Sequence, residues 1–281
     1  MSILVTGFNG KVGLEVAKKL KEMNLAMKCA VRNVGKATSW YRDDYHFVEL
    51  NFSDPNTFDI ALEGVEQLFL IYPPGGDIKF EQFLQTAKEK GVQHIVYLSV
   101  KDVQYLPFIH HFKNEKMIKK LGIPYTFIRA GYFMQNLNDF LGNELRERHR
   151  IYVPAGKGKT SFVDTRDLAE VASMVLTHPE DHQNKNYVIT GDQALDFFDV
   201  AKLMTEVLQV EIQYTNPTVK EFKEFMLKKG VEKEFVDVVV GIHFPTKLGL
   251  ATGITYEYEK VTNKKPRRMK GYINDYKDHW V

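Results

Sequence analysis

Short apolar runs alternate with amphipathic segments along the first 130 residues of the chain. Each run is almost wholly hydrophobic, which is typical of strands buried on both faces of a parallel sheet. The predicted strands are Ile3 to Thr6, Ala26 to Val31, Phe47 to Leu50, Gln67 to Tyr72, His94 to Leu98 and Tyr125 to Arg129. Between them, apolar residues recur at helical spacing, as Val12, Val16 and Leu20 do. The alternation predicts an α/β fold with a doubly wound parallel sheet, whose ligands bind at the carboxyl ends of the strands.

The pattern changes after residue 130. Phe162–Val163 and Tyr187 to Thr190 are expected to return to the sheet as strands, with a helix over Asp167 to Val175 between them. Asp196 to Val210 and Val219 to Val240 are expected to be mainly helical. The chain is therefore expected to form two domains.

The larger expected domain comprises residues 1–130 and 151–192 and contains the sheet. The smaller, mainly helical lobe comprises residues 131–150 and 193–281. We expect this lobe to cover the ligand cleft, with the substrate between the two domains.

A glycine-rich segment directly after the first predicted strand is the strongest motif. It has the spacing G-x-x-G-x-x-G and consists of Thr6, Gly7, Phe8, Asn9, Gly10, Lys11, Val12 and Gly13. The first glycine permits a tight turn, the second lets the backbone approach a pyrophosphate, and the third lets the helix pack on the strand. The helix N-terminus then meets the phosphates. The motif predicts a Rossmann-type dinucleotide site; the alternative is a structural turn without a ligand.

The end of the second predicted strand indicates which dinucleotide binds. An NAD site usually places an acidic residue there for the ribose hydroxyls. This chain has Arg32 at that position and Lys36 one helical turn further on. Cations suit the 2′-phosphate of NADP, so NADP(H) is expected in preference to NAD(H). The alternative is that Arg32 is a plain surface arginine.

Composition narrows the function classes. The 281 residues carry a formal net charge of +2, which argues against nucleic-acid binding through bulk charge. No apolar run approaches the ~20 residues that a membrane span needs. The chain enters its first strand without a signal-type segment, and its single cysteine, Cys29, excludes an internal disulfide. We therefore expect a cytoplasmic protein. A basic run at residues 264–270 is either an anion patch or a solvated tail.

With these features, the chain resembles the NmrA-like, atypical branch of the short-chain dehydrogenase/reductase superfamily. The matching segments are Thr6 to Gly13, Val31–Arg32, His94 to Ser99, His111 to Ile118, Gly122 to Arg129, Gly131 to Asn136 and Phe162 to Ala169. Within the branch, His111 to Met117 is similar to the NADPH-dependent quinone reductases and triphenylmethane-dye reductases, which have a histidine four residues before a glutamate.

The resemblance implies an NADPH-dependent reductase that transfers hydride to a quinone-like or other conjugated aromatic molecule. In such proteins the serine corresponding to Ser99 lies near the nicotinamide, and a polar residue at the position of Asn51 reaches the adenine. Tyr72 and Pro73 follow the fourth strand, where the loop is expected beside the ribose and diphosphate. The alternatives are a capping hydroxyl for Ser99 and a simple turn at Tyr72.

Three residues are expected to contact the substrate or the nicotinamide. His111 is expected to donate a proton or hydrogen bond to the acceptor, or else to face solvent or bond the backbone at a helix start. Tyr132 and Phe133 are expected to face the nicotinamide and an aromatic substrate, or else to be core residues. No metal site is expected, because His110 and His111 are adjacent on a helix and diverge by about 100°.

Two other functions stay open. The Tyr-x-x-x-Lys pair of the wider superfamily is missing from the helix expected after the fifth strand; the spacing occurs at Tyr256 and Lys260, far from that strand, and at Tyr97 and Lys101, in the strand itself. Its displacement is compatible with an NADP(H)-binding redox sensor that needs a protein partner. A nucleoside-diphosphate-sugar epimerase would rest on fold analogy alone. Relatives commonly form homodimers, although no surface pattern in this chain requires one.

Overall fold

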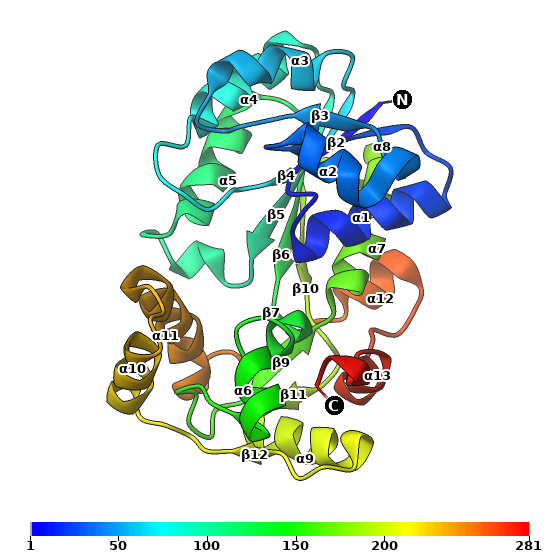
Figure 1. The fold of residues 1–281 in the computed structure, drawn as a ribbon. Helices are drawn as coiled ribbons and strands as arrows, with labels where there is room; N and C mark the ends of the chain where they lie inside the picture. Colours follow the sequence, from blue (N-terminus) through cyan, green and yellow to red (C-terminus); the bar gives the residue numbers. More distant parts are fainter. Residues whose placement is uncertain (1, 281) are drawn as a thin grey trace. The chain divides into compact units, whose positions relative to one another are not determined.

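The computed structural model describes residues 2–280, and its main feature is a seven-stranded sheet (Figure 1). The strand order is β10-β6-β5-β4-β1-β2-β3, and every neighbouring pair is parallel. The strands are β1 (Ile3–Val5), β2 (Met27–Val31), β3 (Phe47–Glu49), β4 (Gln67–Ile71), β5 (His94–Val100), β6 (Tyr125–Ala130) and β10 (Lys185–Ile189). The predicted Rossmann-like, doubly wound sheet is confirmed. Chain order reverses between β1 and β4, where this architecture places its ligands.

Helices cover both faces of the sheet. On one face α1 (Lys11–Glu22) packs against α7 (Thr165–Thr177), and on the other α4 (Phe80–Glu89) packs against α3 (Phe58–Leu62) and α5 (His110–Leu121). The remaining helices here are α2 (Val34–Tyr41), α8 (Pro179–His182) and α12 (Glu257–Thr262). The apolar spacing of α1 explains its position, since Val12, Val16 and Leu20 are all buried.

Helix α12 is attached to α7 by polar contacts. The Tyr258 hydroxyl donates to Glu170 Oε2 at 2.9 Å, and Lys264 forms an ion pair with the other carboxylate oxygen of Glu170. The Glu170 carboxylate is buried, so these partners offset its loss of hydration.

Contacts divide the chain into two compact units that are not the expected domains. The first unit comprises the described residues up to Ala130, Thr165–Ile189 and Glu257–Lys264, and it holds the seven-stranded sheet. The second comprises Gly131–Asp164, Thr190–Tyr256 and the chain from Lys265 on. Relative to the expected boundaries, residues 151–164 and 190–192 belong to the second unit and residues 257–264 to the first.

The second unit has two small sheets and several helices. One sheet has the order β11-β9-β7, and the other pairs β12 with β8. Its elements are β7 (Tyr132–Phe133), β8 (Arg150–Ile151), β9 (Thr160–Val163), β11 (Ala194–Leu195), β12 (Gln213–Tyr214), α6 (Gly142–Arg148), α9 (Phe197–Leu208), α10 (Val219–Lys228), α11 (Lys233–Lys247) and α13 (Met269–Asp275). A buried cluster that includes Phe162, Phe197 and Trp280 forms its core.

One predicted strand has a different partner. Phe162–Val163 was expected to return to the main sheet, but β9 pairs with β7 and β11 instead. All four residues of β9 are buried, so an apolar run correctly predicted a strand without specifying its sheet. The strand expected near Tyr187 does join the main sheet, as β10 beside β6.

The shorter elements are 3₁₀ helices at η1 (Arg42–Asp44), η2 (Pro55–Thr57), η3 (Val103–Tyr105), η4 (Met134–Leu137) and η5 (Lys277–His279). Within residues 2–280, no helix is both long enough and apolar enough to cross a membrane.

Candidate functional site

The glycine-rich turn connects β1 to α1 and is fastened to β4. The Thr6 N–H donates to the Phe69 carbonyl at 3.0 Å, and the Thr6 hydroxyl accepts from the Ile71 N–H at 2.8 Å. Gly7 has a φ of +65°, a conformation that L side chains rarely adopt. The Gly10 N–H then closes the turn on the Gly7 carbonyl at 2.9 Å.

The third glycine is required by packing. A Cβ atom at Gly13 would lie 2.2 Å from the Gly7 carbonyl oxygen, which is a backbone atom and cannot swing aside. This close contact packs the N-terminal residues of α1 directly against the glycine-rich segment that precedes the helix. Gly10 is the N-cap residue of α1, no side chain caps the helix, and no acidic residue occurs in its first turn. The helix N-terminus therefore presents its N–H groups and positive dipole end without a competing carboxylate from that turn.

The other residues of the turn have unequal roles. The Phe8 side chain is fully buried, with ring centroids of Tyr41, Tyr45 and Phe47 at 5.0, 5.0 and 5.1 Å. Val12 is buried too, whereas Asn9 is exposed. Of the predicted cofactor residues, Phe8 and Val12 thus have side chains committed to the core, and only their backbone remains to meet a ligand.

Lys11 begins α1 and is partly buried. Burial lowers the pKa of its ammonium group from 10.5 to about 8. A phosphate at the helix N-terminus would favour the charged form of this lysine.

The carboxyl end of β2 carries the residues predicted to select the dinucleotide. Arg32 is exposed, and no ion pair to it is formed within residues 2–280. Asn33 is the N-cap of α2, and its side chain accepts from the Lys36 N–H at 2.8 Å. The Lys36 ammonium lies 4.7 Å from the centre of the Trp40 ring, so its side chain follows α2.

Asn51 lies just after β3 and Tyr72 just after β4, at the same carboxyl edge of the sheet. The Asn51 side chain accepts from the Ser53 N–H at 3.1 Å, forming a local turn. The Tyr72 ring stacks on His110 with centroids 5.2 Å apart and contacts Phe80 edge-on at 5.2 Å. Pro73, like Tyr72, is half-buried.

Ser99 belongs to a buried ionic cluster between β5, β6 and α5. Its hydroxyl donates to Glu115 Oε1 at 2.7 Å. Arg129 donates to both oxygens of the same carboxylate, from Nε at 3.0 Å and from Nη2 at 2.6 Å. Ser99 is only 1% exposed, so its hydroxyl is committed to Glu115 and is not a loop cap. This arrangement favours a structural role for Ser99 over a catalytic one.

His111 lies in a second, neighbouring polar cluster. Its Nδ1 is 2.8 Å from the Tyr97 hydroxyl, and the Asn114 side-chain amide donates to that hydroxyl at 3.0 Å. Burial lowers the pKa of His111 from 6.5 to about 4. The residue does start a helix, but its partner is a buried tyrosine rather than solvent or the backbone.

Tyr97, Asn114 and Arg129 are site residues that the sequence pattern alone did not single out. A signal was present for each. Asn114 and Glu115 follow His111 at helical spacings of three and four, which place all three on one face of α5. Tyr97 and Ser99 are two apart on β5 and therefore share a face, and Ser99 is paired in register with Arg129.

The predicted substrate residues lie in the second unit. The Tyr132 hydroxyl is 3.0 Å from His243 Nε2, and its ring packs edge-on against Phe162 at 5.2 Å. Burial raises the Tyr132 pKa above its usual range and lowers that of His243 to about 4. Tyr132 is partly buried and packs against the core of its unit. Phe133 is half-buried.

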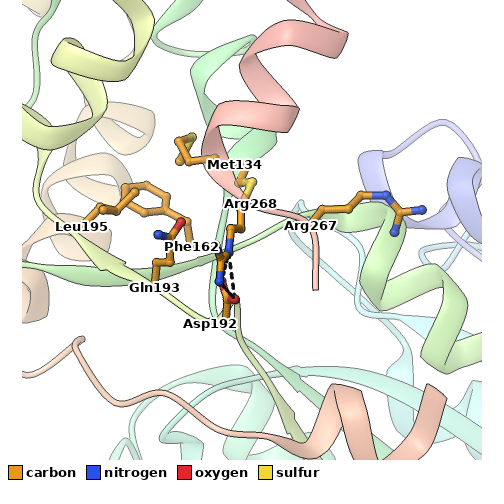
Figure 2. Close-up of a pocket in the computed structure, with 9 residues that line it drawn as sticks. Met134, Phe162, Asp192, Gln193, Leu195, Arg267 and Arg268 are labelled. Atoms are coloured by element: carbon orange, nitrogen blue, oxygen red, sulfur yellow. Dashed lines mark hydrogen bonds and ion pairs between the residues drawn. The ribbon is translucent and has the colours of Figure 1, made fainter. Parts of the chain in front are cut away.

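A small pocket in the second unit contains part of the basic run. Figure 2 shows Arg268 reaching Asp192, with Nη2 and a carboxylate oxygen 2.7 Å apart, while Arg267 points away from this pair. The pocket has a volume of only about 10 Å³, room for about one water molecule. Lys264 and Lys270 of the same run pair with Glu170 and Glu206. Because these cations already have acidic partners, the run is not a ready anion site.

Acidic, cysteine and histidine side chains do not gather into a metal site: no group of three that could hold an ion occurs in the described part of the chain. His110 stacks on Tyr72 while His111 contacts Tyr97, so the adjacent imidazoles have different partners.

Fold and turn together define a Rossmann-like α/β protein with a glycine-rich turn at the first strand. The family model described as the NmrA-like family matches residues 1–273, and the chain belongs to this family. The predicted resemblance is thereby confirmed.

Similar proteins include enzymes and a protein named for development. The NAD(P)H azoreductase of Xenophilus azovorans is 30% identical in an alignment of 273 positions that covers 94% of each chain. Prestalk A differentiation protein A of Dictyostelium discoideum is 26% identical over 98% of this chain and 92% of its own. The triphenylmethane reductase of a Citrobacter species, solved with NADP(H), superposes with a TM-score of 0.86 at 26% identity, covering 98% of this chain and 99% of that one.

Proposed function

We propose that this protein is an NADP(H)-dependent reductase that transfers hydride to a conjugated aromatic small molecule. The observation that carries the proposal is the turn from β1 to α1, in which Gly13 packs on the Gly7 carbonyl and the helix N-terminus has no side-chain cap. Relatives that match nearly the whole chain are named for the reduction of azo compounds and of triphenylmethane compounds, with nicotinamide cofactors in their names.

The residues of the first unit fit a dinucleotide. The N–H groups at the start of α1 suit the pyrophosphate, with Lys11 as the adjacent cation. Exposed Arg32 suits a 2′-phosphate, and no carboxylate occupies its position at the end of β2. Asn51 and Tyr72 are proposed to bound the adenine and ribose. When bound, the reduced dinucleotide supplies the hydride, and the protein contributes orientation and exclusion of water.

The proposed acceptors share one electronic property. Quinones, azo compounds and triphenylmethane cations all have an electron-poor conjugated centre that accepts a hydride without a base to remove a proton from the substrate. A displaced Tyr-x-x-x-Lys pair is compatible with such chemistry. His111 is the residue we propose to face the acceptor. Phe133 and the second unit as substrate cover remain predictions, as do a cytoplasmic location and a homodimer.

The first experiment is NADPH oxidation, followed through the absorbance of the reduced nicotinamide. The acceptors are an azo dye, a triphenylmethane dye, benzoquinone and menadione, each also tested without protein. We expect turnover with at least one acceptor. Tight NADPH binding without turnover on any of them would contradict the reductase and favour the redox sensor, which the name of the Dictyostelium relative leaves open.

The second experiment tests cofactor choice. Arg32→Ala should weaken NADPH binding about tenfold to hundredfold and leave NADH binding nearly unchanged, because one charge-assisted hydrogen bond contributes roughly 1.5–3 kcal/mol. The matched control is Arg42→Ala, which removes an exposed cation at the far end of α2. An unchanged ratio of the two affinities, measured by fluorescence titration, would remove Arg32 from the site.

A further inference from the structure

The contacts of His111 define which of its ring nitrogens carries the proton. Asn114 Nδ2 donates to the Tyr97 oxygen, so the one proton of the Tyr97 hydroxyl is left to donate to His111 Nδ1 at 2.8 Å. Nδ1 is then an acceptor, and in a neutral imidazole the proton must be on Nε2.

The second ring nitrogen is accessible. His111 Nε2 makes no hydrogen bond within residues 2–280, and it is absent from the side-chain atoms that are buried without a partner. His111 is half-buried, so this N–H group is held in a fixed orientation and is left to donate at the start of α5, after the loop that leaves the carboxyl end of β5.

From this geometry we propose that Tyr97 and Asn114 are positioning residues that hold His111 as the Nε2–H tautomer, a hydrogen-bond donor to the acceptor atom that gains negative charge on reduction. This inference rests on the proposed reductase function. It extends that function to a substrate class, because it distinguishes acceptors in which an atom becomes negatively charged on hydride addition from acceptors in which none does.

A neutral donor is favoured over an imidazolium acid. Burial lowers the pKa of His111, and of its charged or titratable neighbours Glu115 favours the imidazolium while His110 opposes it. The Glu115 charge is matched by Arg129. If Nε2 gave up its proton, Nδ1 would have to take the Tyr97 proton and leave a tyrosinate, which burial disfavours. His111 therefore donates a hydrogen bond, and the proton that completes the product comes from water.

Charge balance divides the acceptors into two groups. A hydride added to a quinone breaks a C=O π bond and leaves a negative oxygen; a hydride added to an azo group leaves a negative nitrogen. Both atoms gain from a nearby N–H donor. A cationic triphenylmethane dye takes the hydride at its central carbon and becomes neutral, so no atom gains negative charge and no proton is needed. His111 should matter for the first group and not for the second.

The tautomer is tested directly by ¹⁵N NMR of the histidine rings in the intact protein, without cofactor or acceptor. We expect an unprotonated Nδ1 and a protonated Nε2 for wild-type His111, and averaging of the two tautomers in Tyr97→Phe. The matched control is Tyr187→Phe, which removes the same kind of contact, a tyrosine hydroxyl 2.8 Å from His182 Nδ1, elsewhere in the first unit. A wild-type His111 protonated at Nδ1 would overturn the inference without affecting the reductase proposal.

The donor role is tested by comparing acceptors in the same variants. Tyr97→Phe and His111→Ala should lower kcat with menadione or an azo dye about tenfold to hundredfold more than they lower kcat with a cationic triphenylmethane dye. Tyr187→Phe should leave all three unchanged. Equal losses on both acceptor groups would overturn the donor role. If none of the acceptors supports NADPH oxidation by the wild type, the reductase proposal and the donor role are both contradicted. The NMR result still decides the tautomer.

Discussion

Two regions at the carboxyl edge of the same sheet are built in opposite ways. The turn between β1 and α1 is made of backbone: its contacts are carbonyls, N–H groups and glycines that are close in sequence. The clusters between β5, β6 and α5 are made of buried side chains, Ser99, Glu115 and Arg129 in one and Tyr97, His111 and Asn114 in the other. In the proposed function the first region binds the cofactor through backbone shape and helix dipole, whereas the second region fixes individual protons and charges.

The largest expected effect comes from the side-chain region. Glu115→Ala should lower the free energy of unfolding by about 3–5 kcal/mol, because it leaves the Arg129 guanidinium and the Ser99 hydroxyl without their shared acceptor. Urea unfolding measures the change. The control is Glu22→Ala, whose pairing with Lys19 lies on the surface and should matter little. Similar midpoints for the two variants would mean that the buried pair contributes no stability.

The backbone region should be less sensitive, but even a single added methyl group should have a measurable effect there. Gly13→Ala is expected to cost about 1–3 kcal/mol of stability and to weaken NADPH binding, because the new Cβ would displace the Gly7 carbonyl. Gly35→Ala is the matched control, since a Cβ there meets nothing closer than 3.7 Å. Thermal unfolding and cofactor titration report the two effects. Normal cofactor affinity in Gly13→Ala would separate the turn from the binding site.

Acidification should weaken the side-chain region. The pKa of His111 is about 4 in the folded protein and 6.5 ordinarily, so the unfolded chain binds more protons between these values. The stability that the neutral, buried His111 contributes is therefore fully present above pH 6.5. It is lost as the pH falls toward 4, by up to about 1.4 kcal/mol per pH unit. In His111→Gln the slope of unfolding free energy against pH should be shallower by up to that amount. An identical slope would contradict the burial of a neutral ring.

The smallest expected effect lies beside the turn. Asn33→Ala removes the cap of α2 and should cost about 1 kcal/mol of stability. The NADPH-to-NADH preference should stay unchanged, because the neighbouring Arg32 is retained. Denaturant unfolding and cofactor titration check both statements. A changed preference would show that the cap, and not only the arginine, shapes the end of β2.

The same contrast explains how much the sequence could predict. The turn and α1 were predictable because their residues are contiguous and the glycine spacing has one structural meaning. Helix α5 begins at His110, in a stretch without an apolar stripe from which its first residue could be predicted. The sheet of β9 and the partner of Tyr132 depend on contacts with distant segments, β7 and His243 respectively, which periodicity cannot encode. Arg129 was placed on the correct strand, yet its ion pair depends on the register of β6 beside β5.

The way the chain is shared between its units has a consequence for synthesis. It passes from one unit to the other after residues 130, 164, 189, 256 and 264. The edge strand β10, and α12 with its contacts to Glu170, are therefore among the last parts of the first unit to leave the ribosome. A nascent chain that already contains the whole glycine-rich turn still lacks one border of its sheet. During translation, the glycine-rich turn is therefore complete before the sheet that supports it. A chain stopped before residue 257 should be bound by chaperones or degraded by proteases.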